Sequence, residues 1–286
     1  MKWIGDMSMN AKETIFYPQD EMTTVLVPVT SGCSYNKCAF CGMYKDYKYE
    51  QLPFSDIETV LMNTYEYTER VFLTGAEPLS IGYDKMVKLL NMIKKYVPYC
   101  ACVASYASIK NVEKYSVEQL SILHNLGLRL LYIGFETGRD DILEKMNKQH
   151  RRTEAITQAR KLNEANLIFN SIILYGIAGK DESVSNAIAT ADMINHFNTN
   201  KVITMNLTVF ADTELSRMVD RGEFTPSIGY ERMLELKTLI ENLDPKKDTI
   251  FDTTHPTNII KIKGILPKDK NILLEQLESY MNIMNT

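Results

Sequence analysis

The sequence alternates between short apolar runs and stretches whose apolar residues recur every three or four positions. The runs suit buried strands, and the recurring spacing, as at Met86, Leu89, Leu90 and Ile93, is that of an amphipathic helix. Repeated strand and helix units joined by right-handed crossovers form a parallel sheet. Six runs are predicted as strands: Val25–Val29, Val71–Leu73, Cys102–Ala104, Leu130–Ile133, Ile168–Leu174 and Val202–Val209.

Six such units predict an α/β fold, a partial (β/α)6 TIM-like barrel with a C-terminal extension. In parallel barrels the functional loops follow the carboxyl ends of the strands, so the loop after the first strand is expected at the active-site mouth. Ser55 with Glu58, and Ser116 with Gln119, have the capping-box pattern of helix starts. The charged, proline-containing stretch from Asp244 predicts a boundary, with the barrel in residues 1–243 and an extension or lid packing on it in residues 244–286.

Composition and net charge limit the partners and the cell compartment that we expect for the protein. The chain has 286 residues, 45% of them apolar, which is enough for one large core. A net charge of -4 gives no basic footprint for nucleic acid. No stretch approaches the ~20 apolar residues of a membrane span, and an acid interrupts the start of the chain, Met1–Asp6. We therefore expect a cytoplasmic protein that binds neither nucleic acid nor membrane.

Cys33, Cys38 and Cys41 lie within nine residues of one another, directly after the first predicted strand. Three thiolates can hold a [4Fe-4S] cluster and leave one iron open to a ligand. A tetrahedral zinc needs a fourth ligand, and no histidine or cysteine lies nearby in sequence; this alternative remains open. The other two cysteines, Cys100 and Cys102, are expected in the core, with a second metal site as the alternative.

The cysteine run, its place after the first strand and the repeated units together resemble the radical S-adenosylmethionine (SAM) enzymes, over about residues 24–209. The resemblance implies a [4Fe-4S] cluster on Cys33, Cys38 and Cys41, with the fourth iron bound by the methionine end of SAM. It also implies that the ring of Phe40 packs close to the adenine. Four residues separate the first two cysteines here, whereas the commonest spacing in the family is three.

Further segments resemble the SAM-binding positions of that family. After the second strand, Thr74–Leu79 is similar to a Gly-Gly-Glu-Pro segment, which implies that Gly75 and Glu77 hold the amino group of SAM. The segment that begins at Ile133 resembles the branch that contains oxygen-independent coproporphyrinogen oxidase and the Elongator catalytic subunit. There Glu136 is expected to contact the ribose or the methionine end, and Arg152, rather than Arg151, the SAM carboxylate.

The fifth strand adds two candidates on the adenine and ribose side. Its Tyr-Gly-x-x-Gly end implies that the backbone at Gly176 approaches the purine. Where that branch has an acid for the ribose this chain has Ile172, so Asn170, on the same strand face, is the expected substitute. Ser105, near the end of the third strand, is a polar candidate for the same pocket.

The family chemistry implies that reductive cleavage of SAM yields a 5′-deoxyadenosyl radical, which takes a hydrogen atom from a substrate. No cysteine-rich or basic segment suggests a peptide or RNA substrate, so a small molecule is expected. Tyr44 and His255 are the candidate catalytic residues, and flavodoxin or ferredoxin is the expected class of electron donor. The alternative is an iron-sulfur and SAM-binding redox or trafficking protein without turnover of its own.

Overall fold

The computed structural model describes residues 14–284, in two compact units that are considered separately below. The first unit comprises residues 14–36, 43–132 and 164–167, and the second comprises 37–42, 133–163 and 168–284. The start of the chain, on which part of the cytoplasmic prediction depends, lies outside the described residues. None of the helices between residues 14 and 284 is both long and apolar enough to cross a lipid bilayer.

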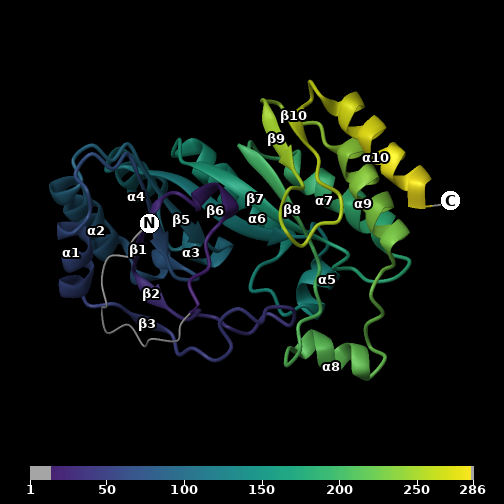
Figure 1. The fold of residues 1–286 in the computed structure, drawn as a ribbon, viewed down its shortest axis with the longest axis horizontal. Helices are drawn as coiled ribbons and strands as arrows, with labels where there is room; N and C mark the ends of the chain where they lie inside the picture. The colour runs from purple at the N-terminus through teal and green to yellow at the C-terminus, as the bar shows by residue number, and fades with distance from the viewer. Residues whose placement is uncertain (1–13, 285–286) are drawn as a thin grey trace. The chain divides into compact units, whose positions relative to one another are not determined.

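The first unit is a parallel sheet of short strands alternating with helices (Figure 1). Its sheet order is β1-β4-β5-β6, and the register pairs Pro28 with Thr74 and Leu73 with Ser105. A small antiparallel pair, β2 and β3, precedes the first helix. Its elements are η1 (Gln19–Glu21), β1 (Val25–Pro28), β2 (Thr30–Ser31), β3 (Glu50–Gln51), α1 (Phe54–Met62), β4 (Arg70–Thr74), η2 (Pro78–Ile81), α2 (Tyr83–Tyr96), β5 (Cys102–Ala107), α3 (Ile109–Glu113), α4 (Val117–Asn125) and the first part of β6 (Leu128–Glu136).

The second unit continues from β6 in the order β6-β7-β8-β9-β10. β7 and β8 are parallel, as are β8 and β9, whereas β10 is antiparallel to β9. α9 packs against both α7 and α10 (Figure 1). The remaining elements are α5 (Asp140–Lys145), α6 (Arg152–Glu164), β7 (Ile168–Tyr175), α7 (Ser183–Ile194), β8 (Lys201–Asn206), α8 (Glu214–Asp220), α9 (Gly229–Asn242), β9 (Thr249–Asp252), β10 (Lys263–Leu266) and α10 (Lys270–Met284).

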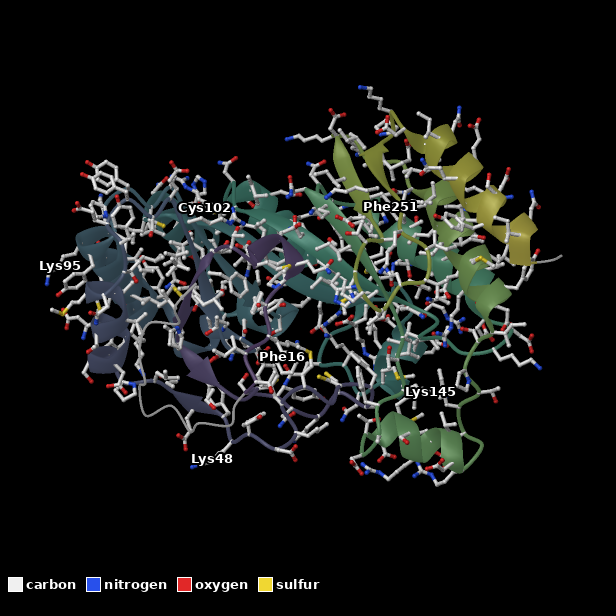
Figure 2. All side chains as sticks on the ribbon, viewed as in Figure 1. Phe16, Lys48, Lys95, Cys102, Lys145 and Phe251 are labelled. Atoms are coloured by element: carbon white, nitrogen blue, oxygen red, sulfur yellow. The ribbon has the colours of Figure 1, made fainter. Side chains whose placement is uncertain are left out.

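All six predicted strands are present. Phe72 in β4 is fully buried. Phe251, marked in Figure 2, is also fully buried, but it lies in β9, which was not predicted from the sequence. The sixth strand is shorter than predicted and ends at Asn206, not Val209. There the backbone N–H of Asn206 donates to the side chain of Asn258, at 2.7 Å, so the parallel ladder stops.

The segment after Asp244 contributes β9, β10 and α10 to the second unit. The register pairs Lys201 of β8 with Ile250 of β9, and Lys263 of β10 with Asp252 of β9. These strands therefore extend the sheet beyond the six that the sequence indicated. The predicted division at residue 243 and the lid role stay predictions.

One of the two predicted capping boxes is wrong. At α4 the Ser116 hydroxyl accepts from the N–H of Gln119 at 3.2 Å, and the Gln119 side chain accepts from the N–H of Ser116 at 3.0 Å, as predicted. At α1 the helix begins at Phe54, after Pro53, with no side-chain cap. Because proline already has the φ angle of a helix start, Ser55 lies inside the first turn, where its hydroxyl donates to Asp56 at 3.1 Å.

The two serines provide a matched pair for a stability measurement. Ser116→Ala is expected to lower the free energy of unfolding by about 1 kcal/mol, because it removes an N-cap. Ser55→Ala should lower it by less than roughly 0.5 kcal/mol, since Ser55 caps nothing. Urea unfolding of both variants checks this, and equal losses would contradict the assignment of the caps.

Candidate functional site

In the first unit, the carboxylate of Glu77 lies against the loop that carries Cys33. Glu77 is 7% exposed at the start of η2, and its Oε2 accepts a hydrogen bond from the hydroxyl of Ser34, the residue after Cys33. Gly75 has a φ of +115°, and a Cβ there would collide with the backbone and side chain of Thr30. A glycine is therefore required where β4 turns toward Glu77.

The other candidates of the first unit lie in the same region of the fold. The Sγ of Cys33 accepts from the N–H of Asn36 at 3.3 Å, and Asn36 also donates from its side chain to the carbonyl of Tyr44 at 2.7 Å. The Tyr44 ring is buried and meets Phe16 edge-on, with 5.3 Å between the ring centroids. Ser105 is fully buried, and its hydroxyl donates to the carbonyl of Tyr106.

In the second unit, the cysteine loop segment of residues 37–42 is held by backbone and side-chain hydrogen bonds. The N–H of Ala39 donates to the carbonyl of Met146 at 2.9 Å, and the carbonyl of Ala39 accepts from the N–H of Leu215 at 2.8 Å. The side chain of Asn147 donates to the carbonyl of Lys37 at 3.0 Å. The loops that follow β6 and β8 therefore position Cys38 and Cys41.

A buried ion pair lies beside this segment. The Nζ of Lys148 is 2.6 Å from Oε1 of Glu136, and the two side chains are 15% and 7% exposed. The ammonium also lies 5.9 Å from the centroid of the Phe40 ring. Burial lowers the pKa of Lys148, but the charges of Glu136, Cys38 and Cys41 outweigh it, so the pKa is raised and the ammonium persists at neutral pH.

Gly134, in β6, makes room for this pair. A Cβ at position 134 would approach within 3.2 Å of the Lys148 ammonium and would collide with the carboxylate of Glu136. Glu136 itself has a φ of +65°, so the strand end is turned to present the carboxylate. The structure thus brings together Phe40, Glu136 and two of the cysteines, and it adds Lys148, for which no role was predicted.

Arg152 does not take part in this arrangement. It begins α6, and its guanidinium forms an ion pair with Asp192 of α7. Arg151 is exposed and pairs with Glu144 at 3.1 Å. The cation beside Glu136 is therefore Lys148, and the placement of Arg152 gives no support to its predicted contact with SAM.

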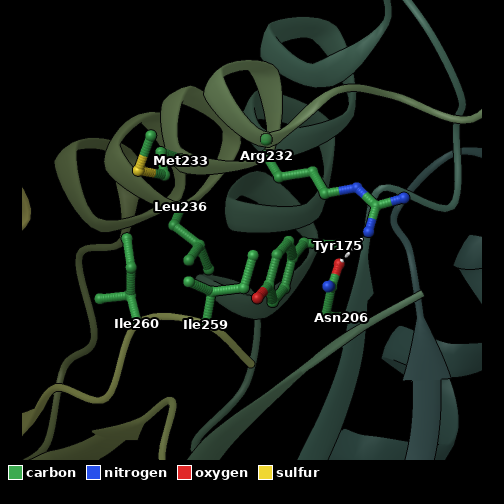
Figure 3. Close-up of a pocket in the computed structure, with 8 residues that line it drawn as sticks. Tyr175, Asn206, Arg232, Met233, Leu236, Ile259 and Ile260 are labelled. Carbon is green, nitrogen blue, oxygen red and sulfur yellow. Dashed lines mark hydrogen bonds between the residues drawn. The ribbon is translucent and has the colours of Figure 1, made fainter. Parts of the chain in front are cut away.

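The loop after β7 contains Gly176, the predicted adenine-side residue. Its φ is +82°, and its N–H donates to the buried carboxylate of Glu235 in α9 at 2.8 Å. Next to it, Tyr175 and Asn206 line a small pocket with the apolar residues Met233, Leu236, Ile259 and Ile260 (Figure 3). Arg232 donates to the side chain of Asn206 at 2.7 Å, which fixes the rim of this pocket.

His255 lies in the loop after β9, which folds over the carboxyl end of β8. Its Nδ1 is 2.8 Å from the hydroxyl of Thr257, and that hydroxyl accepts from the N–H of Asn206 at 3.2 Å. Burial and the charge of Lys261 lower the pKa of His255, so the imidazole is neutral at pH 7. Asn170, in contrast, lies near the amino end of β7, where it accepts from Asn200 at 2.8 Å, so the structure does not group it with Gly176.

Cys102 begins β5 in the first unit and Cys100 lies two residues before it; both are half-buried and not in the core, where they were expected. The Sγ of Cys102 accepts from Arg70 at 3.1 Å, and burial raises the pKa of both thiols. A raised pKa disfavours the thiolate that a metal requires, which agrees with the predicted structural role.

A [4Fe-4S] cluster suits the donors of the cysteine loop. Cys33, Cys38 and Cys41 are free thiols and are half-buried. Among residues 14–284, no three histidine, cysteine or acidic side chains stand together as a metal-binding group, the three loop cysteines included. The thiols of Cys38 and Cys41 act on the charge of the Lys148 ammonium, and a cation near these two thiols suits a cluster that carries negative charge.

Comparisons with known proteins give the family that the chain resembles. The family model described as "Radical SAM superfamily" matches residues 27–191. A heme chaperone, HemW of Bacillus subtilis, is 25% identical over 184 residues, which are 62% of this chain and 48% of that protein. The chain thus spans about half the length of this curated relative.

Solved structures share the fold. The archaeal Elp3 of Methanocaldococcus infernus matches with a TM-score of 0.55 and 14% identity, over 92% of this chain and 63% of its own. Coproporphyrinogen III oxidase (HemN) of Escherichia coli matches with a TM-score of 0.55 and 11% identity, over 76% and 51%. The predicted fold class is confirmed, and the family model that matches is that of the family the sequence resembled.

Proposed function

Because the chain belongs to the radical SAM superfamily, we propose that it is an enzyme that cleaves SAM reductively and takes a hydrogen atom from a small-molecule substrate. Its cofactors are a [4Fe-4S] cluster and SAM, those of the family. Cys33, Cys38 and Cys41 hold the cluster. When bound and reduced, the cluster supplies the electron that breaks a carbon-sulfur bond of SAM and leaves a 5′-deoxyadenosyl radical.

The observation that carries this proposal is the Lys148–Glu136 ion pair beside the cysteine loop. The methionine end of SAM is a zwitterion, with an ammonium and a carboxylate on one carbon. A lysine and a glutamate 2.6 Å apart offer the complementary charges, in a largely buried position where electrostatic attraction is stronger than in water. In this proposal Lys148 binds the carboxylate, and Glu136 accepts from the ammonium or the ribose. For Glu77 and Gly75 we keep the role that the family resemblance implies, at the amino group of SAM.

Other residues orient the nucleoside and the substrate. Phe40 offers an aromatic face to the adenine, and the turn at Gly176 offers its backbone. Tyr44 and His255 are proposed to contact the substrate; His255 is neutral at pH 7 and can therefore accept or relay a proton. The proposed electron donor is a flavodoxin or a ferredoxin, and the proposed compartment is the cytoplasm.

Anaerobic reconstitution tests the proposal. Protein treated with iron and sulfide is reduced with dithionite, SAM is added, and 5′-deoxyadenosine is quantified. Cys38→Ala should lose the cluster absorbance and at least 95% of the product, whereas Cys100→Ala, a cysteine outside the loop, should keep both. Failure of the native chain to bind a cluster, or equal product from Cys38→Ala, would overturn the proposal.

A second candidate function is favoured by the similarity to the heme chaperone HemW. In that case the chain binds SAM and a cluster but transfers heme instead of turning over a substrate. Titration with hemin, followed by the Soret band, separates the two. Stoichiometric heme binding without release of 5′-deoxyadenosine would favour the chaperone.

A further inference from the structure

Glu235 is a buried carboxyl group in the middle of α9. It is 2% exposed and forms no ion pair with the residues that the structure describes. Its Oε2 accepts from the backbone N–H of Gly176 at 2.8 Å, and its Oε1 accepts from the side-chain amide of Asn186 at 2.6 Å. Buried carboxyl groups are retained only where their hydrogen bonds are satisfied, so both donors matter to the local structure.

The same network reaches the loop after β6. The Oδ1 of Asn186 accepts from the hydroxyl of Thr137, the residue after Glu136, and that hydroxyl accepts from the N–H of Arg139 at 3.1 Å. The neighbouring N–H of Gly138 donates to Thr190 of α7 at 3.0 Å. Asn186 of α7 and Glu235 of α9 therefore connect these two helices to two loops. One loop follows Glu136 at the end of β6, and the other contains Gly176.

The charges around Glu235 are few. Arg232, one turn earlier in α9, is the cation that acts on it, and Tyr175 of β7 is the neighbouring phenol. α7 contributes the amide of Asn186 and the buried hydroxyl of Ser183, both of which favour the ionised carboxylate. Burial raises the pKa of Glu235 to about 7, despite the opposing effects of Asn186, Gly176 and Arg232.

We propose that Glu235 is a positioning residue that couples the loops after β6 and β7, so that SAM affinity depends on whether this carboxyl is ionised. The inference rests on the proposed function, because it takes both loops as part of the SAM site. The ionised carboxyl accepts from Gly176 and Asn186 together. The protonated carboxyl has one oxygen that carries a hydrogen and accepts less well, so the hold on one loop weakens.

SAM affinity should fall as the pH falls, because protonation changes the hydrogen bonds of Glu235. The carboxyl is largely ionised at pH 8 and largely protonated at pH 6, since its pKa is about 7. SAM affinity is therefore expected to fall by about three- to tenfold between pH 8 and pH 6, the effect of one hydrogen bond on binding. Glu235→Gln, which is always neutral and presents a donor in place of one acceptor, should bind SAM weakly and lack this step.

The test begins with a readout that needs no SAM. The ¹H–¹⁵N signal of the Gly176 backbone amide should titrate with a midpoint near pH 7, and this titration should vanish in Glu235→Gln. Glu241→Gln, an exposed position on the same helix, is the matched control and should leave the titration unchanged. A Gly176 signal that does not move between pH 6 and pH 8 would overturn the inference whatever SAM does.

SAM binding is then measured on the reconstituted holoprotein by calorimetry at pH 6, 7 and 8. The ratio of native to Glu235→Gln affinity cancels the ionisation of SAM itself, and it should rise with pH. A ratio independent of pH, with a normal Gly176 titration, would overturn the coupling. Absence of SAM binding at every pH would instead point to failure of the proposed function.

Discussion

Lys148→Ala is expected to weaken SAM binding by about a hundredfold, because truncating one partner of a buried charge pair costs roughly 2–5 kcal/mol. The substitution removes the proposed carboxylate ligand and leaves Glu136 unpaired at 7% exposure. Lys148→Arg, which keeps the charge, should restore much of the affinity. Equilibrium dialysis of SAM with each reconstituted variant, at equal cluster content, measures the effect.

Arg152→Ala is the matched control for this prediction. The sequence favoured Arg152 as the carboxylate ligand, but its guanidinium pairs with Asp192 between two helices. Its loss should change SAM affinity by less than roughly twofold, as for a partly exposed ion pair. If Arg152→Ala weakened binding as much as Lys148→Ala, the assignment of the ligand to Lys148 would be wrong.

Glu21→Gln is expected to lower the free energy of unfolding by about 2 kcal/mol, because it removes the charge from the hydrogen bonds that the buried carboxylate accepts. Glu21 is fully buried in the first unit and accepts from Arg70 at 2.8 Å, from Tyr132 at 2.8 Å and from Thr24 at 2.7 Å. Glu50→Gln, in an exposed pair with Lys48 at 3.2 Å, should lower it by less than roughly 1 kcal/mol. Lys48 projects from the surface in Figure 2.

The Glu21–Arg70 pair also makes the free energy of unfolding depend on pH. Burial raises the pKa of Glu21, but its hydrogen bonds and the charge of Arg70 outweigh burial, so the pKa lies below its usual value. The stabilisation is therefore present above about pH 4.3, the ordinary glutamate pKa, and is lost as the pH falls through the lowered folded value. Urea unfolding from pH 7 down to pH 3 should show the native chain and Glu21→Gln converging in stability, and parallel curves would contradict the role of Glu21.

Short-range sequence patterns predicted the features of this protein that depend on residues close together in the chain. The strands follow from buried apolar runs, and the cysteine loop with Gly75 and Glu77 follows from short motifs. The Ser55 cap failed because Pro53, two residues earlier, fixes where the helix begins. The motifs therefore locate each loop, while neighbouring residues decide its hydrogen bonds.

The side-chain positions that depend on contacts between segments far apart in the chain could not be predicted from the sequence. Lys148 lies 12 residues after Glu136, in a polar run that looks like surface, and nothing in the spacing shows that its ammonium turns inward. Glu235 is 59 residues from Gly176 and sits in an otherwise ordinary amphipathic helix. Arg152 had suitable chemistry, but the direction of its side chain is set by Asp192, 40 residues away.

The hydrogen bonds that hold residues 37–42 of the cysteine loop affect how the chain acquires its cluster. Ala39, midway between Cys38 and Cys41, is 2% exposed, and its N–H and carbonyl are both bound by other parts of the second unit. Ordering a free residue costs roughly 1–2 kcal/mol of backbone entropy, and here folding of the polypeptide has already met that cost for the stretch around Ala39. The stretch around Ala39 is therefore in place before iron and sulfide bind, unlike a zinc finger, which folds only when its metal binds. Among the described residues the three thiols are not grouped as a metal-binding site, so assembly of the cluster should still require the cysteine side chains and their flanking residues to move.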